Sequence, residues 1–180
     1  MKNVIILSFF IILFNCKSDK EPKEIKKDFN LTSVSTINKG FSSLLTSTKD
    51  SIYKFQDSSF SAITNFPYGK LISLSHSDRG YARIMAASRK AIYKYQSESW
   101  DKVADFPNGS ISSISYTERS FNRILVTSNT VLYKYQSGKW SVVADFPFGI
   151  ISSAIYTGDS FNSIYVSSKN KIYHLHSRNL

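Results

Sequence analysis

Few residues of this sequence have the types and the spacing that chemistry requires. Cysteine occurs once, at Cys16, so the chain can form neither an internal disulfide nor a cysteine-based zinc site. Acidic residues fall singly in predicted loops or at strand ends, and no two of them stand out as a general acid and base. These acids are Asp78, Asp105, Glu118, Asp145 and Asp159. We therefore predict a protein that is not an enzyme and that uses no cofactor.

Histidine offers one further candidate for chemistry. His174 and His176 lie two residues apart, so on a strand both side chains point to the same face and could hold a metal ion. Alternatively, they fill the positions that Lys134 and Gln136 hold earlier in the chain. No third ligand is evident, and we predict no metal site. His76 stands alone, so no arrangement of serine, histidine and aspartate can be proposed.

The context of Cys16 points to a modification of its sulfur. The chain begins with a short basic segment, and residues 4–14 are apolar except for Ser8. This run is too short for a membrane-spanning helix of about 20 residues, so it is typical of a signal peptide. The Leu13-Phe14-Asn15-Cys16 sequence at its end resembles the lipobox of bacterial lipoproteins.

That resemblance implies that the cysteine carries fatty acyl chains such as palmitate and becomes the new N-terminus. We predict a signal peptide over 1–15, a lipidated cysteine with a polar tether over 16–24, and a folded domain over 25–180. Acyl chains contribute about 0.8 kcal/mol per buried methylene, so several of them hold a protein at a bacterial membrane. In some bacterial lipoproteins an aspartate after the cysteine retains the protein in the inner membrane. Lys17 stands at that position here and favours the outer membrane, and the side of that membrane is left open. The alternative is a plain secretory peptide with a chance cysteine.

The rest of the chain repeats with a period of forty residues. Rows 31–70, 71–110, 111–150 and 151–180 align without a gap, and aromatic residues recur in the same columns. The matched columns hold Phe41, Tyr81, Phe121 and Phe161; Tyr53, Tyr93, Tyr133 and Tyr173; and Phe60, Trp100 and Trp140. A Phe-Pro-x-Gly segment also returns at 66–69, 106–109 and 146–149, where proline and glycine favour a type I turn.

Each row contains four strand-like runs, at 111–116, 123–127, 130–136 and 140–146 in the third row. The second run is apolar on both sides, as in Ile124-Leu125-Val126, so both faces of each sheet must be covered. Stacked sheets arranged around an axis satisfy this requirement. We predict an all-β fold, a small β-propeller of four four-stranded blades, with small serines such as Ser113 on the crowded innermost strands. A solenoid is the alternative.

The last row ends after its third strand. Asp28-Phe29 and the residues after it echo Asp105-Phe106, so a segment before the first row could supply the missing strand. We predict that residues 23–29 pair with 171–176 and close the last blade, which would remove exposed strand edges.

The repeat resembles the bacterial neuraminidase repeat and the two-component-regulator propeller classes. The resemblance rests on Ile124-Leu125-Val126-Thr127-Ser128, on 131–136 and on Trp140. It suggests a glycan-binding or degenerate glycan-active accessory protein as one function. The sequence departs from the neuraminidase Asp-box, because residues 136–140 contain the glycine without an acid, and this counts against sialidase-like activity.

Two sets of residues are candidates for ligand binding. Tyr68, Asn108 and Phe148 vary between constant neighbours in the Phe-Pro-x-Gly segments, as ligand-reading positions on a propeller rim would, although neutral drift gives the same pattern. The recurring Tyr-Lys-Tyr of 93–95 and 133–135 could form a ring of aromatic and basic groups. Packing between blades is the interpretation that we prefer for it.

The net charge of +10 is spread along the chain, and no basic cluster resembles a nucleic-acid motif, so we predict no nucleic-acid partner. A basic surface suits anionic lipid, lipopolysaccharide or acidic glycans, or has no specific partner. We predict a membrane-anchored envelope lipoprotein that binds an unknown envelope protein or glycan through its propeller loops. The alternatives are the glycan-active accessory protein and a structural subunit of an envelope complex. Two chains could also pair into a homodimer with an eight-bladed ring.

Overall fold

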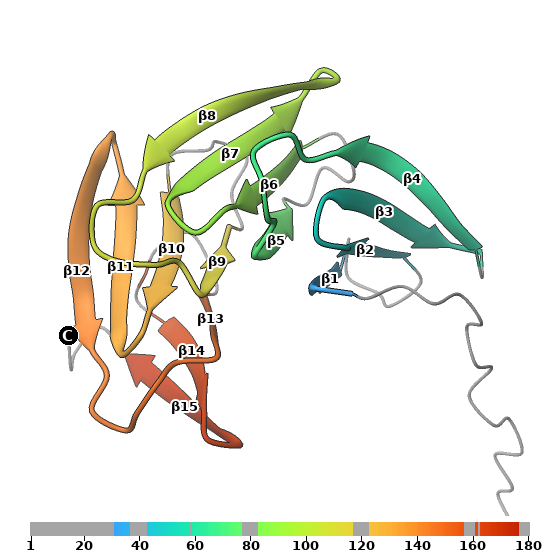
Figure 1. The fold of residues 1–180 in the computed structure, drawn as a ribbon. Helices are drawn as coiled ribbons and strands as arrows, with labels where there is room; N and C mark the ends of the chain where they lie inside the picture. The colour runs from blue at the N-terminus through green and yellow to red at the C-terminus, as the bar shows by residue number, and fades with distance from the viewer. Residues whose placement is uncertain are drawn as a thin grey trace, which may run out of the picture.

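The computed structural model describes residues 31–36, 43–57, 59–76, 83–116, 123–156, 161 and 163–176. Within these residues the regular structure is all β-strand, in three four-stranded sheets and one three-stranded sheet. We call each sheet a blade. The blades follow one another around a common centre, from blade 1 on the right of Figure 1 through blades 2 and 3 to blade 4 below. The chain is an all-β, four-bladed β-propeller, as the sequence predicted.

The strands of each blade pair antiparallel in the order of the sequence. Blade 1 contains β1 (Ser33–Thr36), β2 (Ser43–Ser47), β3 (Ser51–Gln56) and β4 (Ser59–Asn65). Blade 2 contains β5 (Ser73–His76), β6 (Arg83–Ala87), β7 (Ala91–Gln96) and β8 (Ser99–Asp105). Blade 3 contains β9 (Ser113–Ser115), β10 (Arg123–Ser128), β11 (Val131–Gln136) and β12 (Lys139–Asp145). Blade 4 contains β13 (Ser153–Tyr156), β14 (Ser163–Ser168) and β15 (Lys171–His176).

The observed strands match the predicted runs except at the ends of the third repeat. Residues 111 and 112 precede β9, and Phe146 follows β12, because both segments belong to the crossings between blades. Blade 4 has three strands among the described residues. The prediction that residues 23–29 add a fourth falls outside the part of the chain that the structure describes, as do the predicted signal peptide and Cys16. Within the described ranges no helix is long and apolar enough to span a membrane.

Each blade is buried on both faces of its second strand where neighbours cover it. Ile124 and Leu125 are adjacent on β10 and therefore point to opposite faces, yet they are 0% and 1% exposed. Ile124 packs in the cluster between blades 2 and 3, and Leu125 packs in the cluster between blades 3 and 4. The core is thus divided into layers between blades.

The innermost strands β1, β5, β9 and β13 lie side by side around the centre and are joined by serines. The N–H of Leu74 donates to Ser33 Oγ at 3.1 Å, and the same bond recurs from Ile114 to Ser73 and from Ala154 to Ser113. Serine is small enough to let neighbouring innermost strands approach closely, and its hydroxyl therefore reaches the backbone N–H of the next blade. The small residues predicted for these strands therefore carry the hydrogen bonds between blades.

His76 takes a place on β5 that Tyr116 and Tyr156 hold in the following repeats. Its Nδ1 lies 2.7 Å from Ser35 Oγ of the preceding blade. Burial disfavours the charged imidazolium and lowers the pKa of His76 from 6.5 to about 4. The neutral ring is therefore the form that the fold accommodates.

This lowered pKa predicts a loss of stability in mild acid. As the pH falls from about 6.5 to 4, the unfolded chain takes up a proton that the folded chain does not, so the free energy of unfolding decreases. The ring is partly exposed, so we expect a loss of roughly 1–2 kcal/mol, less than a fully buried group would give. Denaturant titrations of wild type and His76→Asn across this pH range measure it.

The variant should lose less stability than wild type over that window, and its difference from wild type at pH 8 gives the cost of the substitution itself. Parallel stability curves for the two proteins from pH 8 to 4 would show that His76 does not titrate in this way.

Candidate functional site

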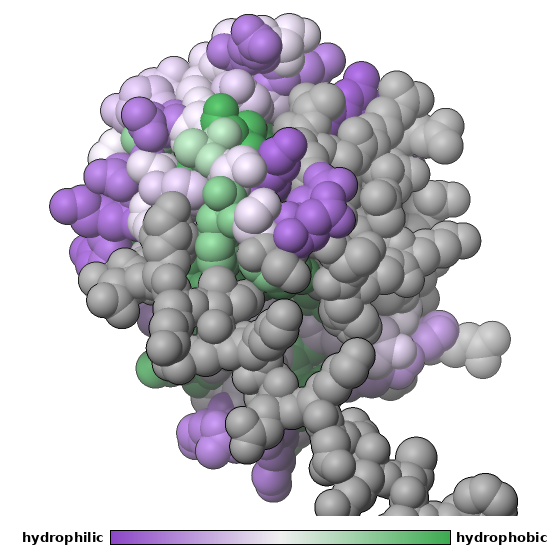
Figure 2. Space-filling view, turned by 90° about the vertical axis from the view of Figure 1, so that its right-hand side faces the viewer, coloured by the Kyte–Doolittle hydropathy of each residue, from purple (hydrophilic) through white to green (hydrophobic). Residues whose placement is uncertain are grey.

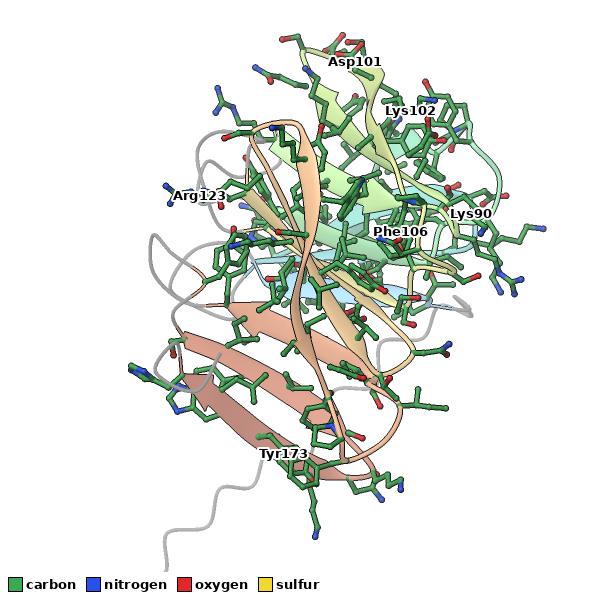
Figure 3. All side chains as sticks on the ribbon, turned by 90° about the vertical axis from the view of Figure 1, so that its left-hand side faces the viewer. Lys90, Asp101, Lys102, Phe106, Arg123 and Tyr173 are labelled. Atoms are coloured by element: carbon green, nitrogen blue, oxygen red, sulfur yellow. The ribbon has the colours of Figure 1, made fainter. Side chains whose placement is uncertain are left out.

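Three connectors carry the chain from one blade to the next on the same side of the propeller. They comprise residues 66–72, 106–112 and 146–152, and we call the surface that they form with the adjacent strand turns the connector face. Each connector folds back onto its own blade. The N–H of Phe106 donates to the carbonyl of Lys90 at 2.7 Å, and the N–H of Ile111 donates to that of Arg89 at 2.9 Å. Figure 3 shows Lys90 and Phe106 together at this edge of blade 2.

The glycine of each connector has a positive φ, at +84° in Gly69, +107° in Gly109 and +114° in Gly149. A side chain here would be strained, and at Gly149 a Cβ would lie 2.8 Å from the Cε of Lys169. The Phe-Pro-x-Gly turn expected from the sequence is therefore present, and glycine is required at its end.

The phenylalanine of each connector is inserted into the following blade. Phe106 is 2% exposed and meets Tyr133 and Trp140 edge to face, with ring centroids 5.2 and 5.0 Å apart. The indole Nε1 of Trp140 donates to the main-chain carbonyl of Asp105 at 2.8 Å. Phe66 makes the same contacts with Tyr93 and Trp100. These aromatic contacts fix the position of the connector on the following blade.

In the first and third connectors the variable residue contacts this buried phenylalanine edge to face, with ring centroids 5.7 Å apart for Tyr68 and 5.3 Å apart for Phe148. Tyr68 is stacked on Tyr93 of the next blade with centroids 4.0 Å apart, and Phe148 is stacked on Tyr173 at 4.9 Å. Tyr68 is 39% exposed and Phe148 is 53% exposed. The structure thus places these two predicted site residues in equivalent, partly exposed positions on one face of the propeller.

Asn108 breaks this stacking pattern on the middle connector. It is exposed, its backbone carbonyl accepts from Ser128 Oγ at 3.4 Å, and it brings no ring to Tyr133. Tyr133 is half-buried, whereas Tyr93, on which Tyr68 stacks, is 8% exposed. The middle connector therefore carries an exposed amide side chain at the position where the other two connectors carry a stacked ring.

The connector face is basic in its described residues. The turns next to the connectors hold exposed lysines and arginines, and only a few acids lie near them. Lys70 lies in the first connector, and the turns beside the connectors hold Lys49, Arg89, Lys90 and Lys169, against the acids Asp50, Asp105 and Asp145. The third connector adds the apolar Ile150, which is 66% exposed beside Phe148. The three connectors share one backbone conformation but expose different side chains, which are basic, amide and apolar.

Two of the five acids considered as catalytic candidates lie in the described residues, and both bond to their neighbours. Asp105 accepts from Lys102 Nζ at 3.0 Å, and this hydrogen bond raises the pKa of Lys102. Asp145 accepts from Thr130 Oγ1 at 3.0 Å. Asp78, Glu118 and Asp159 lie outside the described residues. Asp105 and Asp145 therefore stabilise strand ends and turns.

His174 and His176 lie on one face of β15, as the sequence indicated, with ring centroids 5.9 Å apart. His174 Nε2 is 2.7 Å from Ser163 Oγ, and the ring stacks on Tyr165. Across the described ranges, no group of three or more histidine, cysteine or acidic residues is placed to hold a metal ion.

The Tyr-Lys-Tyr segments pack between blades, which confirms the preferred interpretation. Tyr93 and Tyr95 are 8% and 9% exposed in the cluster between blades 1 and 2. Lys94 points to the opposite face, where its Nζ lies 3.5 Å from a carboxylate oxygen of Asp101. These residues form no ligand ring.

Comparisons with known proteins support the fold. No protein-family model matches the sequence, and no curated protein matches it. A solved structure described as the WD40 beta propeller domain of Doa1 is similar, with a TM-score of 0.54 and 13% identity. The match covers 83% of this chain and 52% of that chain, so this protein spans about half of the solved domain. The likeness shows a β-propeller and leaves the ligand to be argued from the connector face.

The unstacked Tyr133 predicts a stabilising substitution. In Asn108→Tyr the new ring should stack on Tyr133 as Tyr68 stacks on Tyr93, and should raise the free energy of unfolding by about 0.5–1.5 kcal/mol. Chemical denaturation measures this change. The control Asn108→Ser removes the amide without adding a ring and should leave stability close to wild type. Equal stability of the tyrosine and serine variants would mean that no space for a ring exists above Tyr133.

Proposed function

We propose that this protein is a non-enzymatic binding module that recognises its partner with the connector face. The observation that carries the proposal is the pair of exposed rings, Tyr68 and Phe148, each held in place by stacking on the next blade. Rigid aromatic side chains lose little conformational entropy on binding and supply much of the contact energy at interfaces. A side chain that is both fixed and exposed is suited to that role.

The division of labour within each connector supports the same function. The phenylalanine and glycine set the backbone, while the residue between proline and glycine is free to differ. That residue is tyrosine, asparagine or phenylalanine at the three equivalent places. A rigid scaffold that presents variable side chains in this way is the usual arrangement of a binding surface.

The charge of the connector face favours a partner with anionic groups. Lys49, Lys70, Arg89 and Lys90 surround the first two connectors, and the whole chain carries a net charge of +10. Such a surface attracts anionic partners over several ångströms at physiological salt. An acidic region of an envelope protein fits the basic side, and its apolar residues fit Phe148 and Ile150.

A lipid anchor at Cys16 would hold this module at a bacterial membrane. The support is the order of the basic start, the apolar run of residues 4–14, the cysteine and the polar tether that follows it. Lys17 favours the outer membrane. The tether would let the connector face reach a partner in the envelope while the acyl chains stay in the bilayer.

Glycan binding is a second candidate, and Asn108 favours it. A sugar ring can stack on the face of Tyr133 while the Asn108 amide donates and accepts hydrogen bonds at its edge. Asn108→Tyr fills this place. Binding of wild type to an array of acidic and neutral glycans, lost in Asn108→Tyr, would favour this candidate over a protein partner.

The binding proposal predicts where a partner touches the protein. A photoreactive amino acid at position 148 should crosslink to a partner in intact cells, because Phe148 lies on the connector face. The matched control is position 142 in the middle of β12, where Val142 is 59% exposed but lies away from the connectors. Gel shifts and mass spectrometry of the crosslinked products give the result. Identical products from both positions, or no product from 148, would exclude the connector face as the interface.

The anchor is tested separately. Full-length protein with Cys16→Ser should lose all incorporation of labelled fatty acid and should leave the membrane fraction, because the chain has no other cysteine. Ser18→Ala in the tether is the control and should keep both properties. Label retained by the Cys16→Ser protein would show that lipid is attached elsewhere.

A further inference from the structure

The two end faces of the propeller are the two halves of a boundary that occurs three times inside the chain. At each internal boundary, one face of a blade covers the opposite face of the next blade. Leu45 and Ile52 of blade 1 pack against Leu71 and Leu74 of blade 2, and all four are at most 4% exposed. Equivalent clusters join blade 2 to blade 3 and blade 3 to blade 4.

The outer face of blade 4 repeats the first half of this boundary, but it is open. Tyr165 and Ile172 stand where Leu125 and Leu132 stand in blade 3. Leu125 and Leu132 are 1% and 0% exposed, whereas Tyr165 is 38% and Ile172 is 78% exposed. Ile155 adds a third exposed apolar side chain, and the three line a shallow, mostly apolar depression.

The outer face of blade 1 repeats the second half and is open as well. Leu31 and Val34 stand where Leu71 and Leu74 stand in blade 2, yet they are 46% and 57% exposed instead of 0% and 4%. Figure 2 looks onto the side of the molecule where blade 1 lies and shows apolar residues, in green, open between hydrophilic ones. Both faces are exposed in the same molecule, so blade 4 does not cover blade 1 of its own chain.

The serine bonds between innermost strands end at the same place. Ser33, Ser73 and Ser113 each accept an N–H from the next blade, and Ser153 is the following member of the series. By the repeat alignment, the N–H that Ser153 would accept corresponds to that of Val34 in a blade 1. The exposed Ser153 therefore fits the first strand of a second copy.

We infer that two copies of this chain associate end to end, blade 4 of each on blade 1 of the other, and close one eight-bladed ring. Two sets of four blades reach eight, within the range of propellers. This chain matches about half of the length of a solved propeller domain, as one half of a ring would. Each association is heterologous, and two of them close the ring without leaving an open end.

A cysteine pair across the proposed contact tests this in the full-length protein. We would combine Ser153→Cys with Val34→Cys in a Cys16→Ser background, so that no other thiol is present, and apply a mild oxidant. The internal pair Ser113→Cys with Ala154→Cys is the matched control, because the two residues are joined by the equivalent bond of 3.4 Å. It should crosslink within one chain and calibrate the geometry.

The expected product of the Ser153→Cys, Val34→Cys protein is a covalent dimer on a non-reducing gel, absent from either single variant. A crosslink at monomer mass would show that one chain closes its own ring. A ladder of larger products would show an open filament. No product, while the internal pair crosslinks, would exclude the contact. Each of these three results overturns the inference.

A second variant separates the contact from the fold. Ile172→Glu places a charge on a side chain that is 78% exposed in one copy, so the single chain should still fold. It should lower the yield of covalent dimer at least tenfold, while Val142→Glu, exposed on β12, should leave the yield unchanged. An unchanged yield with Ile172→Glu would overturn the inference. The inferred dimer does not depend on the connector face, so a result that excludes the dimer leaves the proposed binding function unaffected.

Discussion

The propeller depends on a sheet that cannot be stable alone. The second strand of each blade is apolar on both sides, as Ile124 and Leu125 show in blade 3, and both side chains are fully buried only because a blade lies on each side. A single four-stranded sheet with two apolar faces would expose both of them to water. The inserted phenylalanines, the serine bonds and the connectors all act at the boundaries that this requirement creates.

The repeat made most of this fold predictable. Forty-residue spacing, four runs per row and apolar residues on both sides of the second run together predicted the blades, and the observed strands follow them closely. The strand ends were less accurate, because Phe146 looks like the end of a β-strand although it turns into the next blade. Alternation along a strand describes which face a residue lies on, but it does not describe the crossing that follows.

The candidate site was predictable in position but not in geometry. Variation between constant neighbours located Tyr68, Asn108 and Phe148, whereas stacking on the next blade joins residues 25 apart and has no local signal. The bond from His76 to Ser35 crosses a blade boundary in the same way. The repeat offered one clue, since His76 replaces a residue that is tyrosine in the next two rows. Whether the end faces stay open also depends on the angle between successive blades, and side-chain packing at the blade boundaries sets this angle.

Each connector is hydrogen-bonded to a turn of the blade that precedes it, so every repeat contains the means of placing its successor. In genetic terms, an in-frame duplication of one repeat copies the strands of a blade and the connector that follows them. It also copies the aromatic residues that contact the phenylalanine of the preceding connector. Such a copy carries its own contacts to the blade before it and to the blade after it. The number of blades can then change by duplication. The side chains on the connector face can change separately, by point mutation of one codon in each repeat.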